Sequence, residues 1–309
     1  MTRYCLSTAL AGLSLSCTLA LAQPDSNEKL PFRLYVGNSM GNNVSVIDLG
    51  SLKVVDNLTV GAHVHCVALT PDGRRLFTTS ESDKALVISD TSTGKIIATV
   101  NMPGRPNECA VTPDARFVTV PIRDGNSVVI VDAIQQKIVK ILPIKDPHNS
   151  VNIGSNRYSF VSSMTSHDID IIDFEKLDFS AQIPVGGMPR PFVVSKDGRT
   201  LYVAVSDLHG FNIVDVDTQK LLQKVEMPSQ HPGPPRPRKY ETPDTYTHGL
   251  ALTPDETEVW VTSLLDDCIY IYDLKAKKVV ARLNTGDGPN WVVFSPDGKY
   301  GCVSSTDSE

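Results

Sequence analysis

A short apolar strand that ends in an aspartate returns six times along the 309-residue chain. The six aspartates are Asp48, Asp90, Asp132, Asp173, Asp215 and Asp273. The steps between their positions are 42, 42, 41, 42 and 58, and five of the aspartates are followed five residues later by a lysine. A period of about 40–45 residues, with four short strands per repeat, is typical of β-propellers. The spacing therefore predicts an all-β chain built from four-stranded blades.

A second phrase recurs at the same interval between these aspartates. The phrase consists of Ser or Thr, followed by Pro or Lys and then by Asp. Its five copies begin at Thr70, Thr112, Ser195, Thr253 and Ser295. Proline presets φ and a following glycine tolerates the left-handed region, so the phrase predicts a tight turn. We interpret the aspartates of both phrases as turn formers that bond nearby backbone, and not as catalytic groups.

The strands of one repeat can be placed between these turns. In the second repeat the β-branched runs predict strands at 67–69, 76–79, 85–89 and 96–100. Residues 33–60 supply the second to fourth strands of a first repeat, and five full repeats follow. The chain then offers an inner strand at 291–295 and a second strand at 301–304.

The blade count follows from where the repeats stop. At Glu309 the third strand of a seventh repeat would begin, so we expect a seven-bladed propeller whose last blade is truncated in this sequence. The period implies that about 35–40 further residues would complete it. A six-bladed ring is the alternative, but it leaves 301–304 surplus. An open ring would expose unpaired strand edges, which folded proteins avoid.

Residues 1–22 have the features of a signal peptide. Arg3 is followed by a mostly apolar run, and Ala20-Leu-Ala22 offers a small-x-small cleavage site. The run is too short to cross a membrane. We predict a signal peptide over 1–22, an N-terminal linker over 23–31 and a single propeller domain over 32–309. The chain is then exported, periplasmic or extracellular, with no transmembrane segment.

Charge and cysteine content exclude several classes of function. The formal net charge is −6 and there is no basic run, which argues against a nucleic-acid partner. The cysteines at 66, 109, 268 and 302 have the spacing of neither a disulfide framework nor a zinc knuckle, so we expect small buried strand residues. No nucleophile elbow, phosphate-binding loop or His-Glu-x-x-His motif is present. We expect a monomer.

The repeat between Asp215 and Asp273 is longer than its neighbours. The extra residues fall within 228–247, a segment that contains six prolines. Proline at this density excludes a helix or a central strand. The segment is therefore predicted to be a loop insertion between a fourth strand and the next inner strand.

All seven histidines fall in, or at the end of, the connections that open on one face of such a propeller. Aligned on the turn phrase, the residues at the mouths of six inner strands are His65, Asn107, His148, Arg190, His248 and Asn290. Three converging imidazoles suit zinc or copper, so His65, His148 and His248 are candidate metal ligands. The alternative is that these polar side chains line a wet channel and bind water.

The other aligned positions point to an organic ligand. An arginine at 190, near Asn107 and Asn290, would suit a carboxylate or phosphate group. Glu108 and Trp291 replace the small residue typical of the next position, so both are candidate channel-lining groups. The predicted ligand-binding set is Asn107, Glu108, Arg190, Asn290 and Trp291, and no residue is assigned a catalytic role.

The phrases Leu34-Tyr-Val-Gly-Asn38, Val44-Ser-Val-Ile-Asp48 and Leu201-Tyr-Val-Ala204, with the Pro-Asp-Gly turns, resemble the YVTN β-propeller repeat family. The resemblance covers nearly all of 32–304. It implies an exported bacterial or archaeal protein of the surface-layer or periplasmic type, and it says little about chemistry because fold does not determine function.

Our first functional hypothesis is a non-catalytic module that binds a protein or a small ligand through its histidine-bearing face. The alternative is a metal-dependent hydrolase or lactonase-type enzyme with zinc or copper at the three aligned histidines. A third hypothesis is a periplasmic redox-associated propeller, although the sequence contains no cofactor motif for it.

Overall fold

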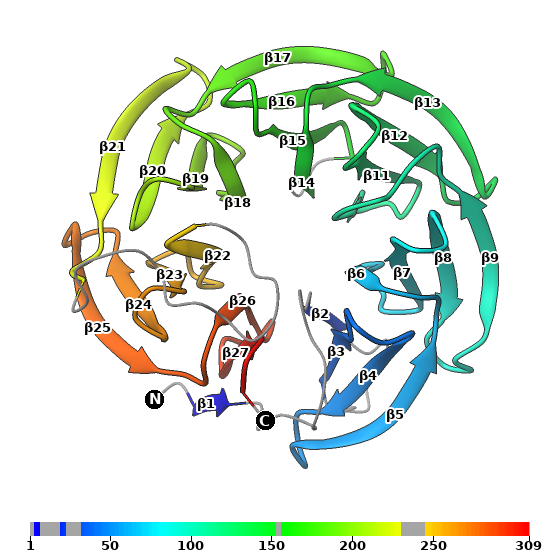
Figure 1. The fold of residues 1–309 in the computed structure, drawn as a ribbon, viewed down its shortest axis with the longest axis horizontal. Helices are drawn as coiled ribbons and strands as arrows, with labels where there is room; N and C mark the ends of the chain where they lie inside the picture. The colour runs from blue at the N-terminus through cyan, green and yellow to red at the C-terminus, as the bar shows by residue number, and fades with distance from the viewer. Residues whose placement is uncertain (1–2, 7–18, 23–31, 153–155, 230–244, 309) are drawn as a thin grey trace. The chain divides into compact units, whose positions relative to one another are not determined.

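The computed structural model describes residues 3–6, 19–22, 32–152, 156–229 and 245–308. Every regular element in these ranges is a strand, and they contain no helix that could cross a membrane. The strands form six four-stranded sheets and one three-stranded sheet (Figure 1). This topology confirms the predicted all-β propeller of four-stranded blades.

Four sheets follow one another in the first part of the chain. They are β2 (Leu19–Ala22), β3 (Arg33–Gly37), β4 (Asn43–Asp48) and β5 (Lys53–Thr59); β6 (Val64–Leu69), β7 (Arg75–Ser80), β8 (Ala85–Asp90) and β9 (Ile96–Asn101); β10 (Ala110–Val111), β11 (Phe117–Ile122), β12 (Ser127–Asp132) and β13 (Lys137–Pro143); and β14 (Pro147–Asn152), β15 (Tyr158–Ser163), β16 (Asp168–Asp173) and β17 (Asp178–Pro184).

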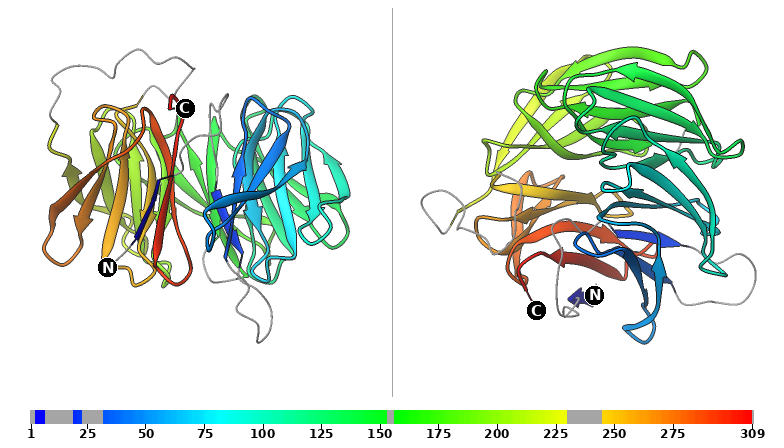
Figure 2. Two further views of the ribbon diagram at one scale, coloured as in Figure 1. Left: turned by 90° about the horizontal axis from the view of Figure 1, so that it is seen from below. Right: turned by 45° about the vertical axis from the view of Figure 1, so that its right-hand side comes forward.

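Three sheets follow in the second part. They are β18 (Pro189–Val194), β19 (Thr200–Val205), β20 (Gly210–Asp215) and β21 (Lys220–Glu226); β22 (Thr247–Leu252), β23 (Glu258–Ser263), β24 (Cys268–Asp273) and β25 (Lys278–Asn284); and β26 (Pro289–Phe294) and β27 (Tyr300–Ser305), which β1 (Arg3–Leu6) joins beside β27. Figure 2 shows the strands of a sheet running alternately up and down beside one another.

The chain divides into two compact units. Unit 1 comprises Met1–Ser16, His167–Ile169 and Ile183–Glu309, and unit 2 comprises Cys17–Ser166 and Asp170–Gln182. Unit 2 therefore holds the first three sheets and most of the fourth, and unit 1 holds the last three. The single domain over 32–309 stays a prediction.

The repeated aspartates act as turn formers. Each is the last residue of the third strand of its sheet, and its Oδ1 accepts hydrogen bonds from backbone N–H groups two or three residues later, at 2.6–3.0 Å. In the second phrase, the first hydroxyl donates to the aspartate at 2.5–2.7 Å in all five copies. The residue after that aspartate has positive φ in every copy, including Ala115 and Glu256. The structure thus confirms the predicted local role of both phrases.

The core lies between neighbouring sheets. Phe77 and Leu86 of β7 and β8 belong to one buried cluster with Val118 and Val120 of β11. Within each unit the middle strands are buried on both faces because neighbouring sheets pack together, and removing this apolar surface from water stabilises the fold. The fourth strands are half-exposed. In β13, for example, Leu142 is buried, and the other residues are exposed or half-buried. Cys66, Cys109, Cys268 and Cys302 are buried, as predicted.

Strands β1 and β2 come from the residues predicted to be a signal peptide. Leu19–Ala22 pairs with Arg33–Val36 of β3 as the first strand of its sheet, and Arg3–Leu6 pairs in parallel with β27. The repeat pattern had not assigned either segment to a strand. Apolar segments can pair with β3 and β27 because the edges of these strands present unpaired backbone groups. The signal peptide over 1–22 stays a prediction.

Two predicted segments lie largely outside the described residues. They are the linker over 23–31 and residues 230–244 of the insertion over 228–247. The described ends of the insertion are held by their neighbours: the hydroxyl of Tyr270 contacts the carbonyl oxygen of Pro228 at 2.5 Å, and Thr247 begins β22.

Candidate functional site

The residues predicted at the strand mouths share one structural position. His65, His148, Arg190, His248 and Asn290 are each the second residue of the first strand of a sheet. Asn107 directly follows an isolated bridge between Pro106 and Ile122. Pairing with the second strand skips this position, for example from Val64↔Ser80 to Val67↔Thr78. Such a β-bulge turns side chains away from the regular alternation and is frequent beside binding sites.

In four sheets a hydroxyl group on the second strand accepts the backbone N–H that the bulge leaves unpaired. The backbone N–H of Cys66 donates to Thr79 Oγ1 at 2.8 Å. The same bond joins Asn149 to Ser162, Gly249 to Thr262 and Trp291 to Ser304, at 2.7–3.2 Å. In the sheet of β18 the residue that corresponds to Cys66 is Pro191, which has no N–H to donate. The residue that corresponds to Thr79 is Ala204, which has no hydroxyl. The sequence therefore carries a signal for the bulge that the repeat period alone does not show.

In unit 2 the bulges bring His65, Asn107 and Glu108 close together. His65 Nδ1 lies 3.4 Å from Glu108 Oε1, and both side chains are buried. Asn107 is 0% exposed, and neither its carboxamide oxygen nor its nitrogen has a hydrogen-bond partner among the described residues. Buried polar groups almost always have a partner, from protein, water or ligand. Within the described residues, the carboxamide of Asn107 therefore keeps its donor and acceptor available for another group.

A charged cluster that the sequence analysis missed surrounds Glu81, which follows β7 and is 3% exposed. We call Glu81, His63, His65, Arg105 and Arg123 the Glu81 cluster. Arg105 Nη2 donates to Glu81 Oε2 at 3.1 Å and Arg123 Nη1 donates to Oε1 at 3.4 Å. The Nε2 atoms of His63 and His65 lie 3.9 and 3.6 Å from this carboxylate. Two guanidinium groups therefore share one buried carboxylate.

The charge of this cluster is specific to two sheets. Glu81 and Arg123 occupy the position after the second strand, and their N–H groups bond His63 O and Arg105 O. In the other sheets this position holds Asn38, Met164, Ser206, Leu264 and Thr306. The loop after the second strand therefore forms with a neutral side chain at this position in the other sheets. The two charged residues at this position are the sequence signal that could have located the cluster.

In unit 1 three predicted residues meet. His248 Nδ1 lies 3.1 Å from the carbonyl oxygen of Asn290, and its ring centroid lies 5.9 Å from that of Trp291. Asn290 is 0% exposed, and its carboxamide atoms also have no hydrogen-bond partner among the described residues. Arg190 Nε donates to Ser206 Oγ of its own sheet at 2.7 Å. The asparagine position thus has the same property in both units.

A second buried cluster in unit 1 contains a histidine, a serine and a carboxylate. His209 Nε2 lies 2.8 Å from Ser263 Oγ and 3.7 Å from Asp266 Oδ2, and the hydroxyl of Tyr270 lies 2.7 Å from that same oxygen. Burial lowers the pKa of His209, and the Asp266 carboxylate opposes this effect. Both the serine and the acid contact one ring nitrogen, whereas a nucleophile–base–acid relay needs them on opposite nitrogens. We therefore interpret this cluster as structural.

The predicted metal ligands lie in different units. His65 and His148 are in unit 2 and His248 is in unit 1, and all three are buried. Within the described ranges, no group of three or more His, Cys, Asp or Glu side chains is arranged to hold a metal ion. Zinc or copper at these three histidines stays a prediction.

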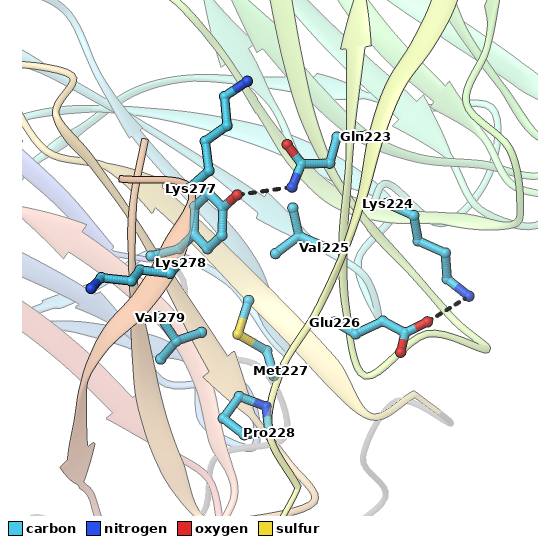
Figure 3. A pocket seen from close by; sticks show the side chains of 10 residues that line it. Gln223, Lys224, Val225, Glu226, Met227, Pro228, Lys277, Lys278 and Val279 are labelled. Carbon is cyan, nitrogen blue, oxygen red and sulfur yellow. Dashed lines mark hydrogen bonds and ion pairs between the residues drawn. The ribbon is translucent and has the colours of Figure 1, made fainter. Parts of the chain in front are cut away.

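Figure 3 shows a surface pocket of about 520 Å³ in unit 1, between β21 and the turn that leads into β25. Its buried walls are Val225, Met227 and Tyr272. The hydroxyl of Tyr272 accepts a hydrogen bond from Gln223 at 3.0 Å. The pocket contains none of the predicted site residues, so we do not assign a function to it.

Comparison with known proteins supports the propeller fold. A family model described as "Lactonase, 7-bladed beta-propeller" matches residues 186–304. The hydrazine synthase of Kuenenia stuttgartiensis superposes with a TM-score of 0.77 at 18% sequence identity, over 97% of this chain and 95% of that one. At this identity the likeness concerns the fold alone.

A curated relative is antigen Lp49 of Leptospira interrogans serogroup Icterohaemorrhagiae serovar copenhageni (strain Fiocruz L1-130). It is 30% identical over 153 residues, which are 47% of this chain and 30% of Lp49. The chain thus matches under a third of the length of that relative. Together these matches show a relation to β-propeller proteins, and they do not confirm the finer YVTN assignment.

Proposed function

We propose that the chain is a non-catalytic binding module of the exported, YVTN-repeat type, which holds a small ligand at the bulged starts of its first strands. Asn107 carries the proposal, because its carboxamide is fully buried and has no hydrogen-bond partner among the described residues. Each unit has its own proposed contacts: Asn107 and Glu108 in unit 2 and, separately, Arg190, Asn290 and Trp291 in unit 1.

The energetic argument is that an unpaired buried amide is expensive. Leaving such a group unsatisfied costs about 1–3 kcal/mol, whereas an apolar group of similar shape at the same place avoids this cost. Residues that reduce stability in this way are typical of binding sites, where function opposes stability. A ligand that carries a hydroxyl or carbonyl group would complete the bonds of Asn107.

The test is a thermal-shift screen of the full chain against lactate, gluconate, glucose, glycine and γ-butyrolactone. We expect at least one compound to raise the melting temperature. Asn107→Leu should stabilise the chain without ligand and abolish that shift. Asn290→Leu tests the equivalent position in unit 1, and it should abolish the shift of a compound that binds there. A compound shift that persists in both variants would contradict the proposal.

A lactonase-type hydrolase is the second candidate, and the family model over 186–304 favours it. In this case a metal ion would be held by His65, His148 and His248. Elemental analysis of the purified chain and of His148→Ala, with γ-butyrolactone hydrolysis measured in parallel, tests this candidate. Stoichiometric metal that is lost in the variant would support it. Metal-free protein with an intact fold and no hydrolysis would remove it.

A further inference from the structure

We propose that Arg105 and Arg123 form the anion-binding part of the site in unit 2, and that the ligand carries a carboxylate group. This inference rests on the proposed binding function and adds the chemical class of the ligand. The structural basis is the Glu81 cluster, in which one buried carboxylate holds two guanidinium groups.

Both guanidinium groups retain donors for a ligand. Arg105 and Arg123 each contact Glu81 through one terminal nitrogen, and no other acceptor contacts either guanidinium among the described residues. A guanidinium has five N–H donors in a planar fork that matches a carboxylate. Both side chains are 46% exposed, so the remaining donors are accessible.

The anchor prepares the two side chains for binding. A free surface arginine loses rotamer freedom when it binds, and a side chain that is already held loses less. Glu81 is 3% exposed and its backbone N–H is bonded to His63 O at 3.0 Å, so the anchor itself is fixed. A buried carboxylate is costly unless it is paired, which links the position of Glu81 to both arginines.

The charge balance favours a single negative charge on the ligand. The two guanidinium groups carry two positive charges, and Glu81 neutralises one of them. Glu108 lies beside His65, and the carboxylates of Asp83 and Asp124 cap the backbone N–H groups of Ala62 and Arg105. Because these acidic groups add further negative charge, a ligand with one negative charge would meet less repulsion than a phosphate dianion, and the exposed donors of the two guanidinium groups would be its attractive contacts. Two residues after Arg105, Asn107 offers a donor and an acceptor to the rest of the ligand, as in a small hydroxy acid.

The experiment measures binding of acetate, lactate, gluconate, inorganic phosphate and glycerol to the full chain, by ligand-observed NMR and calorimetry at constant ionic strength. We expect saturable binding of a carboxylate. Arg105→Gln and Arg123→Gln should each weaken it about 10- to 100-fold, the range for a lost charged hydrogen bond. Arg105→Lys keeps the charge and should weaken it less, because it removes only the fork.

Arg157→Gln is the matched control. Arg157 is 43% exposed and also pairs with a buried carboxylate, Asp173 at 3.0 Å, but it lies outside the Glu81 cluster. It should bind the carboxylate as the wild type does. Equal affinity in Arg105→Gln, Arg123→Gln and the wild type overturns the proposal, as does preference for phosphate. Glycerol binding that depends on Asn107, without carboxylate binding, overturns this inference alone. Absence of binding by every probe overturns the proposed function as well.

Discussion

Glu81 and Asp266 are buried carboxylates, one in each unit, and their neighbours differ. Glu81 is held by two arginines whose outer atoms are exposed. Asp266 contacts the hydroxyl of Tyr270 and the imidazole of His209, which are themselves mostly buried. A buried charge needs partners in either case. The arginines beside Glu81 keep exposed N–H donors that a ligand could reach, whereas the buried partners of Asp266 can only stabilise the fold.

His209 should make stability depend on pH. Its pKa is lowered in the folded chain because burial disfavours the charged imidazole, although Asp266 partly opposes this. The unfolded chain then binds the proton more readily than the folded chain. The contribution of neutral His209 to the free energy of unfolding is therefore fully present above the ordinary pKa of histidine, and it is lost as the pH falls from that value toward the pKa in the folded chain. Denaturant unfolding of the wild type should show this loss between about pH 7 and pH 5.

His209→Gln is the comparison for that measurement, and it should lose less stability than the wild type over the same interval. The aspartates with a lowered pKa affect stability in a different pH range. The pKa of Asp90, for example, is lowered to about 2 by hydrogen bonds from Ser92 and Thr93, so its effect appears only in more acidic solution. Parallel pH curves for the two proteins would contradict the role of His209.

At the residue scale, the sequence located positions better than contacts. The alignment placed His65 and Asn107 correctly at one repeated position, because that position has a fixed distance from the turn phrase. Glu81 was not predicted. It lies on the other side of the turn phrase from His65, and the two side chains come together only because β6 pairs with β7. Arg105 and Arg123 come from the next sheet, so their approach depends on how the two sheets pack.

At the scale of the element, one hydroxyl completes the hydrogen bonds of the bulge at the start of β6. Thr79 Oγ1 accepts the N–H of Cys66 at 2.8 Å and donates to Asn107 O at 2.6 Å. It therefore links the first strands of two neighbouring sheets. The bulge is what removes His65 and Asn107 from regular pairing, so the hydroxyl supports the site indirectly.

Thr79→Val should lower the free energy of unfolding by about 1–3 kcal/mol, because it leaves a buried N–H and a buried carbonyl without their partner. Thr78→Val is the control. Thr78 is adjacent and equally buried, but its hydroxyl has no hydrogen-bond partner among the described residues, so this change should be neutral or stabilising. Denaturant unfolding measures both. Equal effects of the two changes would show that the bond of Thr79 contributes nothing.

The elements themselves were predictable because their signals are local. The strands predicted at 76–79 and 85–89 are β7 and β8, each within one residue at both ends. An aspartate that bonds the N–H groups two and three residues ahead needs no distant partner. The bulge was not predicted, because it appears only in the pairing of the first strand with the second.

At the scale of the whole molecule, the described residues form seven sheets, and one edge of two of them is filled by β1 and β2. A chain that starts at Gln23 would leave β3 and β27 each with an unpaired edge. Such edges favour association with other chains. We therefore expect the shorter chain to unfold at a lower temperature and to self-associate as its concentration rises.

Thermal unfolding and light scattering after size exclusion, applied to chains 1–309 and 23–309, measure this difference. Equal melting temperatures and monomeric behaviour of both chains would show that β1 and β2 add nothing to the folded state. That outcome would agree with a signal peptide that is removed. The intact mass of protein recovered from the periplasm would then identify the cleavage point predicted after Ala22.

The sequence by itself determined the propeller class, the repeat boundaries and the turn-forming role of the aspartates. These properties depend on periodic and short-range signals, which a single chain displays directly. Only the tertiary structure decided that Arg105 and Arg123 share Glu81, and that the carboxamide of Asn107 is buried without a partner among the described residues. Such contacts depend on bulges and on the packing of one sheet against the next. Repeat spacing therefore predicts where a site can lie, and strand pairing decides which side chains form it.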